Sequence, residues 1–362
     1  MTSLRARYMR LLAEAGLDEY QHFVRTKFQE FQKNLSEGVD PELLDAVAAI
    51  SRFISEPDFL TLLNESYSHL SLPSLDKDIY FGLFPTPTLN AELVNLESEG
   101  YLGLLHGGLT GLIAVAVEAV VYSSVSHTPD GRRVPPLMTL QEAALVVRKA
   151  VEAVRRGWGG TGVDPTPKQL SELIWILETS AAGVSFVVMH EWAHAWKGHL
   201  EEAEPVRLAT PSGDFWVNRA SIEQEWEADT VAAGWVVGQV QERSRELSED
   251  ARGVLIPPLL AGPLIVLMLI AWSEEGGHSP RVVTHPPGAE RLLELRNRLH
   301  REMTNTLEFR RAWNFVSHLE SLGLASGVTG RQFFGLGERP QEGPYIEIVQ
   351  GEKGIQLRQP RE

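Results

Sequence analysis

The chain has 362 residues, of which 43% are hydrophobic, so it can bury a large core as one big domain or two modest ones. Its 48 acidic and 33 basic residues give a formal charge of −15, which argues against binding to nucleic acid or to an anionic membrane surface. The chain has no cysteine, which excludes disulfides, thiolate nucleophiles and cysteine-bound zinc, so any metal must be held by His, Asp and Glu.

The first 75 residues predict a helical extension packed on the main body. Apolar side chains recur at helical spacing among many charges, as at Phe23, Phe28 and Phe31. No apolar run precedes Glu14, so the N-terminus does not resemble a secretory signal, and the expected location is the cytoplasm.

From Tyr80 the sequence predicts a strand, a turn, a second strand and then an apolar helix. Residues 126–167 are rich in Pro, Gly and Arg around one helical stretch at 139–155, which is typical of an insertion. Helices then dominate from residue 168 to 322, and PYIEIVQGEKGIQLRQ predicts a terminal β-hairpin. The fold class is therefore α+β and mainly α, with a core at 76–300 and a C-terminal helix and hairpin at 301–362.

Residues 253–272, GVLIPPLLAGPLIVLMLIAW, are apolar over about the length that a bilayer span needs. Pro257, Pro258 and Pro263 are expected to break the first half of this segment. The nine apolar residues after Pro263 would form only about 13 Å of helix, against about 30 Å of hydrocarbon. The segment therefore favours a buried core helix, and no membrane span is expected.

The stretch VVMHEWAHAWKGH carries the chemistry most specific to this chain. On the apolar helix predicted here, His190 and His194 lie one turn apart on one face, where both imidazoles can bind one zinc ion. Glu191 follows His190, which gives the pattern HExxH, in which the glutamate is the general base for a metal-bound water. The alternative is a pair of hydrogen-bonded core histidines, although burying two histidines and a carboxylate without a partner is costly.

A catalytic zinc needs a third protein ligand. His199 follows Gly198, where the helix is expected to end, so it is interpreted as a neighbour of the helix C-terminus. The segment EQEWEADTVAAGWVVGQV predicts a second helix, reached through a loop at PVRLATPSGDF, with Glu225 and Asp229 one turn apart. Glu225 is assigned as the ligand and Asp229 as the acid that orients a ligating histidine. The alternative is a solvated acidic face.

These residues resemble the gluzincin metallopeptidases, in which HExxH is followed by a helix with ExxxD, as in HtpX, BepA and the CAAX proteases. The match comprises His190-Glu-Trp-Ala-His194 and Glu225-Trp-Glu-Ala-Asp229. A strand led by Asn90 and Ala91, with a later Gly-Leu, resembles one that these peptidases carry. A His-Pro pair at His285 before an arginine-bearing helix is the fourth match, and the four follow the family's order over residues 80–300. The short gap between the two helices is similar to that of ImmA/IrrE-like peptidases and the phage-exclusion protease Lit.

The resemblance implies a zincin-like core that uses Zn²⁺ to cleave a protein or peptide. It also implies that Asn90 and Ala91 bind substrate, and that the strand around residues 102–105 offers an unpaired edge to an extended peptide. His285 is a candidate catalytic group that stabilises a substrate oxygen or orients a ligand; the alternative is a histidine that opens a proline turn.

Three functions stay open on the sequence alone. The first is a soluble zinc-dependent metalloendopeptidase of broad specificity. The second is a latent or single-target metalloprotease of a regulatory or phage-defence kind, with residues 1–75 and 126–167 supplying recognition or a lid. The third is a non-enzymatic helical binding module whose HExxH helix is only structural.

Overall fold

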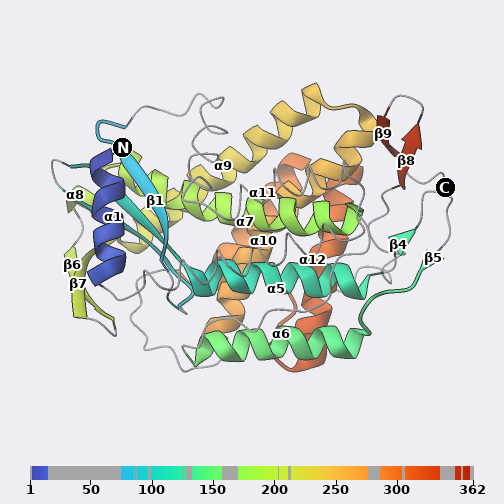
Figure 1. Cartoon of the computed structure of the whole chain (residues 1–362), viewed down its shortest axis with the longest axis horizontal. Helices are drawn as coiled ribbons and strands as arrows, with labels where there is room; N and C mark the ends of the chain where they lie inside the picture. The colour runs from blue at the N-terminus through green and yellow to red at the C-terminus, as the bar shows by residue number, and fades with distance from the viewer. Residues whose placement is uncertain are drawn as a thin grey trace.

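The structure is a computed structural model, and its helices enclose a large apolar core beside a small sheet (Figure 1). It describes residues 2–14, 75–84, 86, 88–96, 99–124, 126–127, 133–156, 170–202, 204–210, 213–275, 286–303, 306–334, 347–351 and 354–358. The α+β, mainly α class predicted from the sequence is confirmed. Of the predicted N-terminal helices, α1 (Thr2–Glu14) is described, whereas Phe23, Phe28 and Phe31 lie outside the described residues.

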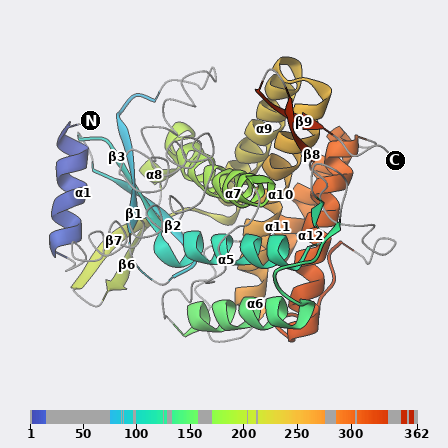
Figure 2. The same ribbon diagram turned by 45° about the vertical axis from the view of Figure 1, so that its right-hand side comes forward.

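The main sheet has the order β1-β3-β2, with β1 parallel and β2 antiparallel to the central β3. Its strands are β1 (Ile79–Phe84), β2 (Ala91–Asn95) and β3 (Tyr101–His106). Helix α1 covers one face through Leu4, Tyr8 and Leu12, and the other face joins the helical core (Figure 2). The sheet and α1 thus form one end of the molecule.

The apolar runs predict two strands, which are β1 and β3, and the Asn-Ala strand implied by the family resemblance is β2, which begins at Ala91. One expectation about this sheet is wrong: the strand around residues 102–105 is not an edge, since β3 pairs along both sides. Among the described strands of this sheet, β2 is an outer strand, and it begins at Ala91, directly after Asn90.

Seven long helices and one short helix follow the sheet in the described part of the chain. They are α5 (Gly107–Ser123), α6 (Leu140–Arg155), α7 (Leu170–Trp196), α8 (His199–Glu202), α9 (Ile222–Glu246), α10 (Glu249–Glu275), α11 (Gly288–Met303) and α12 (Leu307–Ser326). Helix α6 matches the helix predicted at 139–155, and its first turn is closed by a capping box between Thr139 and Glu142. Helix α7 lies against α5, α9 and α10, which makes it the centre of the bundle.

Three two-stranded hairpins complete the described elements. They are β4 (Ser126–His127) with β5 (Arg133–Val134), β6 (Glu204–Thr210) with β7 (Gly213–Arg219), and β8 (Glu347–Gly351) with β9 (Gly354–Arg358). The predicted C-terminal hairpin is thus confirmed, at the opposite end from α1 (Figure 1). The loop predicted at PVRLATPSGDF is wrong: the alternating Val206 and Leu208 before the turn, and Phe215 and Val217 after it, have a strand period.

Helix α10 contradicts the expectation that prolines break the apolar segment. It continues through Pro257, Pro258 and Pro263, although a proline removes the backbone N–H that bonds the carbonyl four residues earlier. At Pro257 that carbonyl belongs to the buried Gly253, and the Arg311 guanidinium on α12 donates to it over 2.6 Å. A side chain from a neighbouring helix therefore replaces the lost backbone donor, which the sequence of the segment alone does not show.

Residues 251–275 of α10 are long and apolar enough to span a membrane by length and composition, and 89% of the most apolar window is buried inside the protein. Gly262 of α10 meets Gly183 of α7 so closely that a Cβ on Gly262 would collide with the backbone of α7. The two helices therefore pack with their backbones in near contact, which fixes α7 in the core.

We expect Arg311→Met to destabilise the protein by about 1–3 kcal/mol, because it leaves the buried Gly253 carbonyl without this donor. Urea unfolding would measure the loss. Arg310→Met, on the exposed neighbour, is the control and should change the free energy of unfolding by less than about 0.5 kcal/mol. In a Pro257→Ala background the backbone N–H returns, so the cost of Arg311→Met should shrink; an equal cost in both backgrounds would contradict this explanation.

Candidate metal centre

Helix α7 carries both histidines of the HExxH pattern at its buried C-terminal half. His190 and His194 are one turn apart, and both are at most 5% exposed among the apolar side chains of the core. Their rings meet edge to face with centroids 4.9 Å apart, so the two Nε2 atoms approach each other at 3.2 Å. The face of α7 that bears them points toward α9 rather than into solvent.

Helix α9 brings the acidic pair to this face. It begins after Ser221, whose hydroxyl accepts from the backbone of Gln224 while the Gln224 side chain accepts from Ser221 N–H. Small residues at Ala228, Ala232 and Ala233 are buried and allow α9 to lie close against the core. Glu225, one turn from the start, is 2% exposed, so the alternative of a solvated acidic face is wrong for this residue.

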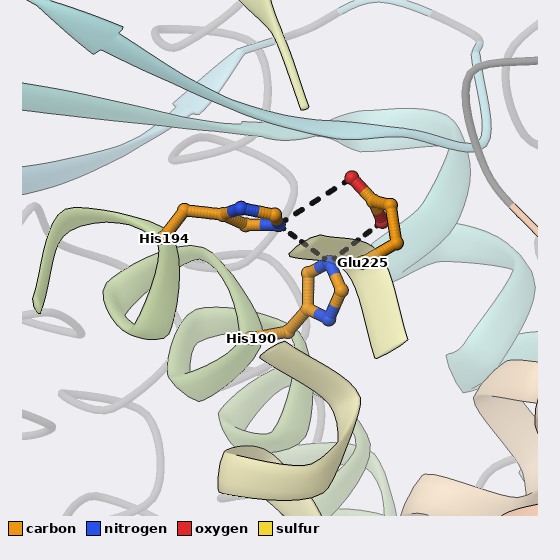
Figure 3. A group of neighbouring side chains, drawn as sticks. All are labelled: His190, His194 and Glu225. Carbon is orange, nitrogen blue, oxygen red and sulfur yellow. Dashed lines mark hydrogen bonds and ion pairs between the residues drawn. The ribbon is translucent and has the colours of Figure 1, made fainter. Parts of the chain in front are cut away.

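The side chains of His190, His194 and Glu225 converge on one point, as Figure 3 shows. His190 Nε2 lies 3.2 Å from Glu225 Oε2, and His194 Nε2 lies 3.4 Å from Glu225 Oε1. One ligand atom from each residue lies within 4.8 Å of the others. Two imidazoles and one carboxylate, buried together, fit a divalent metal with three protein ligands, which is the donor set of catalytic zinc sites that keep a fourth position open.

The electrostatics of the site favour a cation. Burial alone would lower the pKa of His190, but its hydrogen bonds and ion pairs with Asp229 and Glu225 outweigh burial and raise that pKa to about 10. The two carboxylates that favour a proton on His190 favour equally any cation placed between the ligand atoms. A metal ion would therefore compete with that proton for the same position.

Asp229 lies behind His190 and orients it, with Asp229 Oδ1 at 2.9 Å from His190 Nδ1. Arg291, from α11, makes a bidentate ion pair with the same carboxylate: Nε donates to Oδ2 and Nη2 donates to Oδ1, each over 2.7 Å. Burial alone would raise the pKa of Asp229, but the charge of Arg291 and the hydrogen bonds outweigh it and hold the pKa well below its ordinary value. Asp229 is therefore ionised, and it directs His190 Nε2 toward His194 and Glu225.

Sequence reasoning gave Arg291 no role beyond marking a helix, although a signal was present. Arg291 shares the apolar face of α11 with Leu295 and Leu299, at spacings of four and eight residues. A charged residue on a buried stripe needs a partner, and Asp229 supplies it.

We expect Arg291→Met to destabilise the chelator-treated protein by about 3–5 kcal/mol, because it strands the buried Asp229 carboxylate without its guanidinium partner. Equilibrium unfolding in urea would measure this. The control is Arg301→Met on the same helix, where the side chain is 66% exposed and the ion pair with Glu294 should contribute no more than about 1 kcal/mol. Equal losses of unfolding free energy for the two variants would show that the ion pair of Arg291 with Asp229 stabilises the protein no more than the exposed pair of Arg301 does.

His199 was interpreted as a neighbour of the helix C-terminus, but the structure places it against a histidine of the site. Gly198 has φ 72°, a left-handed conformation that ends α7 and turns the chain back. His199 is thereby buried, with Nδ1 at 3.0 Å from His194 Nδ1 and Nε2 at 3.1 Å from Glu227 Oε2. Only the geometry of the turn reveals this contact, since the spacing of five residues is not a helical one.

Glu191 is 7% exposed and follows His190 on α7. Its negative charge affects Glu92 on β2, whose pKa is raised to about 7. Burial raises this pKa most, the hydrogen bond from Asn90 opposes the rise, and the charge of Glu191 adds a smaller rise. The predicted general base therefore lies close to the strand that follows Asn90 and begins at Ala91. Sequence reasoning did not identify Glu92.

The structure thus gathers most of the predicted site residues in one region. His190, His194 and Glu225 converge, and Asp229 holds His190 from behind. Asn90 donates to Glu92 over 2.9 Å, and Ala91 is buried at the start of β2. His285 lies outside the described residues, so its predicted role stays a prediction.

The chain was compared with known families, with curated proteins and with solved structures. The model of one family, Peptidase U49, matches residues 127–315, which is just over half of the chain. No curated protein and no solved structure matches the chain. The matched region holds α7, α9 and α11, and with them His190, Glu191, His194, Glu225 and Arg291, whereas β1, β2 and β3 precede it.

Proposed function

Since this chain belongs to the Peptidase U49 family and is therefore a peptidase, we propose that it is a zinc-dependent endopeptidase in which His190, His194 and Glu225 hold the metal. In this proposal Glu191 is the general base and the substrate is a protein or peptide. Membership in a peptidase family argues against the alternative of a non-enzymatic binding module.

One observation carries the metal assignment: two imidazole nitrogens and a carboxylate from two different helices meet in the protein interior. A core would not gather these three groups without a cation to share, because each one loses its hydration on burial. The chain has no cysteine, so a site of nitrogen and oxygen donors is the kind it can build. Two histidines with one glutamate favour zinc among the divalent metals.

A bound zinc ion would polarise the scissile carbonyl and lower the pKa of a bound water toward about 7. Glu191 would accept the proton of the attacking water and deliver it to the nitrogen of the leaving amine. Its position directly after His190 on α7, with 7% of the residue exposed, is compatible with this role. Asp229 and Arg291 would keep the His190 ring in the orientation that metal binding requires.

The surrounding fold is compatible with a zincin-like core of the gluzincin kind. The HExxH helix α7 contacts β2 and β3, and the second helix α9 supplies the third ligand. An outer strand beside the catalytic helix suits a substrate held in extended form, because a peptide can be added to such a strand through backbone hydrogen bonds. In this role β2 replaces the strand predicted from the sequence, and Asn90 and Ala91 lie at its start.

Hydrolysis of unfolded casein by the purified protein, before and after chelation, tests the proposal. We expect cleavage that stops on removal of the metal and returns with stoichiometric zinc. Cleavage that persists in full after the metal has been removed would overturn the zinc mechanism. If casein stays intact, mapping of new protein N-termini in cells that express the wild type or Glu191→Gln would reveal a single-target protease, and identical maps would argue against proteolysis.

A further inference from the structure

His199 and Glu227 form a chain of contacts that starts at a proposed metal ligand and ends at the surface. His194 Nδ1 lies 3.0 Å from His199 Nδ1, and His199 Nε2 lies 3.1 Å from Glu227 Oε2. Lys197 Nζ holds the other oxygen, Glu227 Oε1, at 2.7 Å. The two histidines are buried, whereas the side chain of Glu227 is 46% exposed.

The direction of the hydrogen bonds follows from the two ends of this chain. Glu227 Oε1 pairs with the Lys197 ammonium over 2.7 Å, so the Glu227 carboxylate is the acceptor and His199 Nε2 donates to it. With its proton on Nε2, His199 presents Nδ1 as the acceptor for His194 Nδ1–H. His194 is left with a bare Nε2 on the side of His190 and Glu225, which is the form that binds a metal.

We propose that His199 is a positioning residue for the metal site: it accepts a hydrogen bond from His194 Nδ1, and Glu227 holds it in the orientation and tautomer that this requires. This inference rests on the proposed zinc site and adds to it the means by which the second histidine is oriented. The two proposed ligands are thus supported differently. Asp229 bonds His190 directly, whereas the carboxylate of Glu227 acts on His194 through the intervening His199 ring.

A substitution pair separates the hydrogen bond from the packing of the ring. His199→Phe keeps a planar ring of similar size but has no acceptor, whereas His199→Asn can place an amide oxygen near the position of Nδ1. His318→Phe is the matched control, because His318 is a partly buried histidine on α12 whose Nε2 contacts the Ser123 hydroxyl of α5. Thermal unfolding of the chelated proteins would show that all three variants fold.

Competition of each protein with a chromophoric zinc chelator measures the effect. We expect His199→Phe to weaken zinc binding by about 10- to 100-fold, the usual effect of removing the partner of a metal-bound histidine. His199→Asn should recover most of that affinity, and His318→Phe should bind as the wild type does. The visible absorption of the cobalt-loaded His199→Phe protein should also differ from that of the wild type, which a purely structural role would not produce.

The outcomes distinguish the positioning role of His199 from the proposed zinc site on which it rests. If His199→Phe binds zinc as tightly as the wild type does, the positioning role is overturned and the proposed metal site is not affected. Equal weakening in His199→Phe and His199→Asn also overturns it, because packing rather than the hydrogen bond would then be responsible. A wild-type protein that binds no zinc overturns both the inference and the proposed function.

Discussion

Glu191→Gln should lower the rate of peptide hydrolysis by about 100- to 10,000-fold while the protein still binds zinc. Glutamine has nearly the same shape as glutamate but cannot accept the proton of the attacking water. Because Glu191 is not among the three residues that converge on the candidate metal position, its replacement should leave metal content unchanged. Activity on casein and metal analysis of the same sample would measure the two effects separately.

The matched control for Glu191→Gln is Glu178→Gln. Glu178 lies on the same helix, away from the site, and its carboxylate is 3.5 Å from the Arg243 guanidinium. It should retain wild-type activity. A Glu191→Gln protein that hydrolyses casein at the wild-type rate would exclude Glu191 as the base, and one that loses its metal would mean that Glu191 is a ligand.

Glu225→Ala should weaken zinc binding on the order of 1,000-fold or more, because it removes the only carboxylate in the proposed ligand set. This loss should exceed the effect of about 10- to 100-fold expected from the residues that orient the histidines. Hydrolysis should be lost together with the metal, and excess zinc should restore part of it. Isothermal titration with zinc at neutral pH would give the affinities.

The control for Glu225→Ala is Glu223→Ala, two residues earlier on α9. Its side chain is exposed, so it should bind zinc as the wild type does. If the Glu225→Ala protein still binds zinc tightly, another acid must complete the site, and the assignment of Glu225 is wrong. If both variants lose zinc equally, the effect is the general loss of negative charge from the start of the helix.

Local patterns in the sequence were sufficient to predict the helices that build the site. The apolar, proline-free run before His190 predicted α7, and the ExxxD spacing predicted that Glu225 and Asp229 share one face of α9. These predictions hold because a helix imposes a fixed relation between residues three and four apart. The convergence of the two helices was an inference from chemistry, since nothing local required them to meet.

The features that sequence reasoning missed depend on contacts between distant segments or on a single turn. The prolines of α10 were expected to break the helix, but the donor that replaces the lost N–H comes from Arg311 on another helix. The contact of His199 with His194 depends on the left-handed Gly198, and the strand order that puts β3 in the centre depends on pairing across the sheet. Periodicity along the chain contains none of this information.

Anomalous X-ray scattering from a crystal of the protein, recorded on both sides of the zinc absorption edge, would show whether His190, His194 and Glu225 hold zinc. We expect one strong zinc peak at about 2.0–2.1 Å from Nε2 of His190 and Nε2 of His194, with a Glu225 oxygen completing the protein ligands. A crystal grown with zinc that has no peak between these three side chains, or whose zinc lies on other residues, would contradict it.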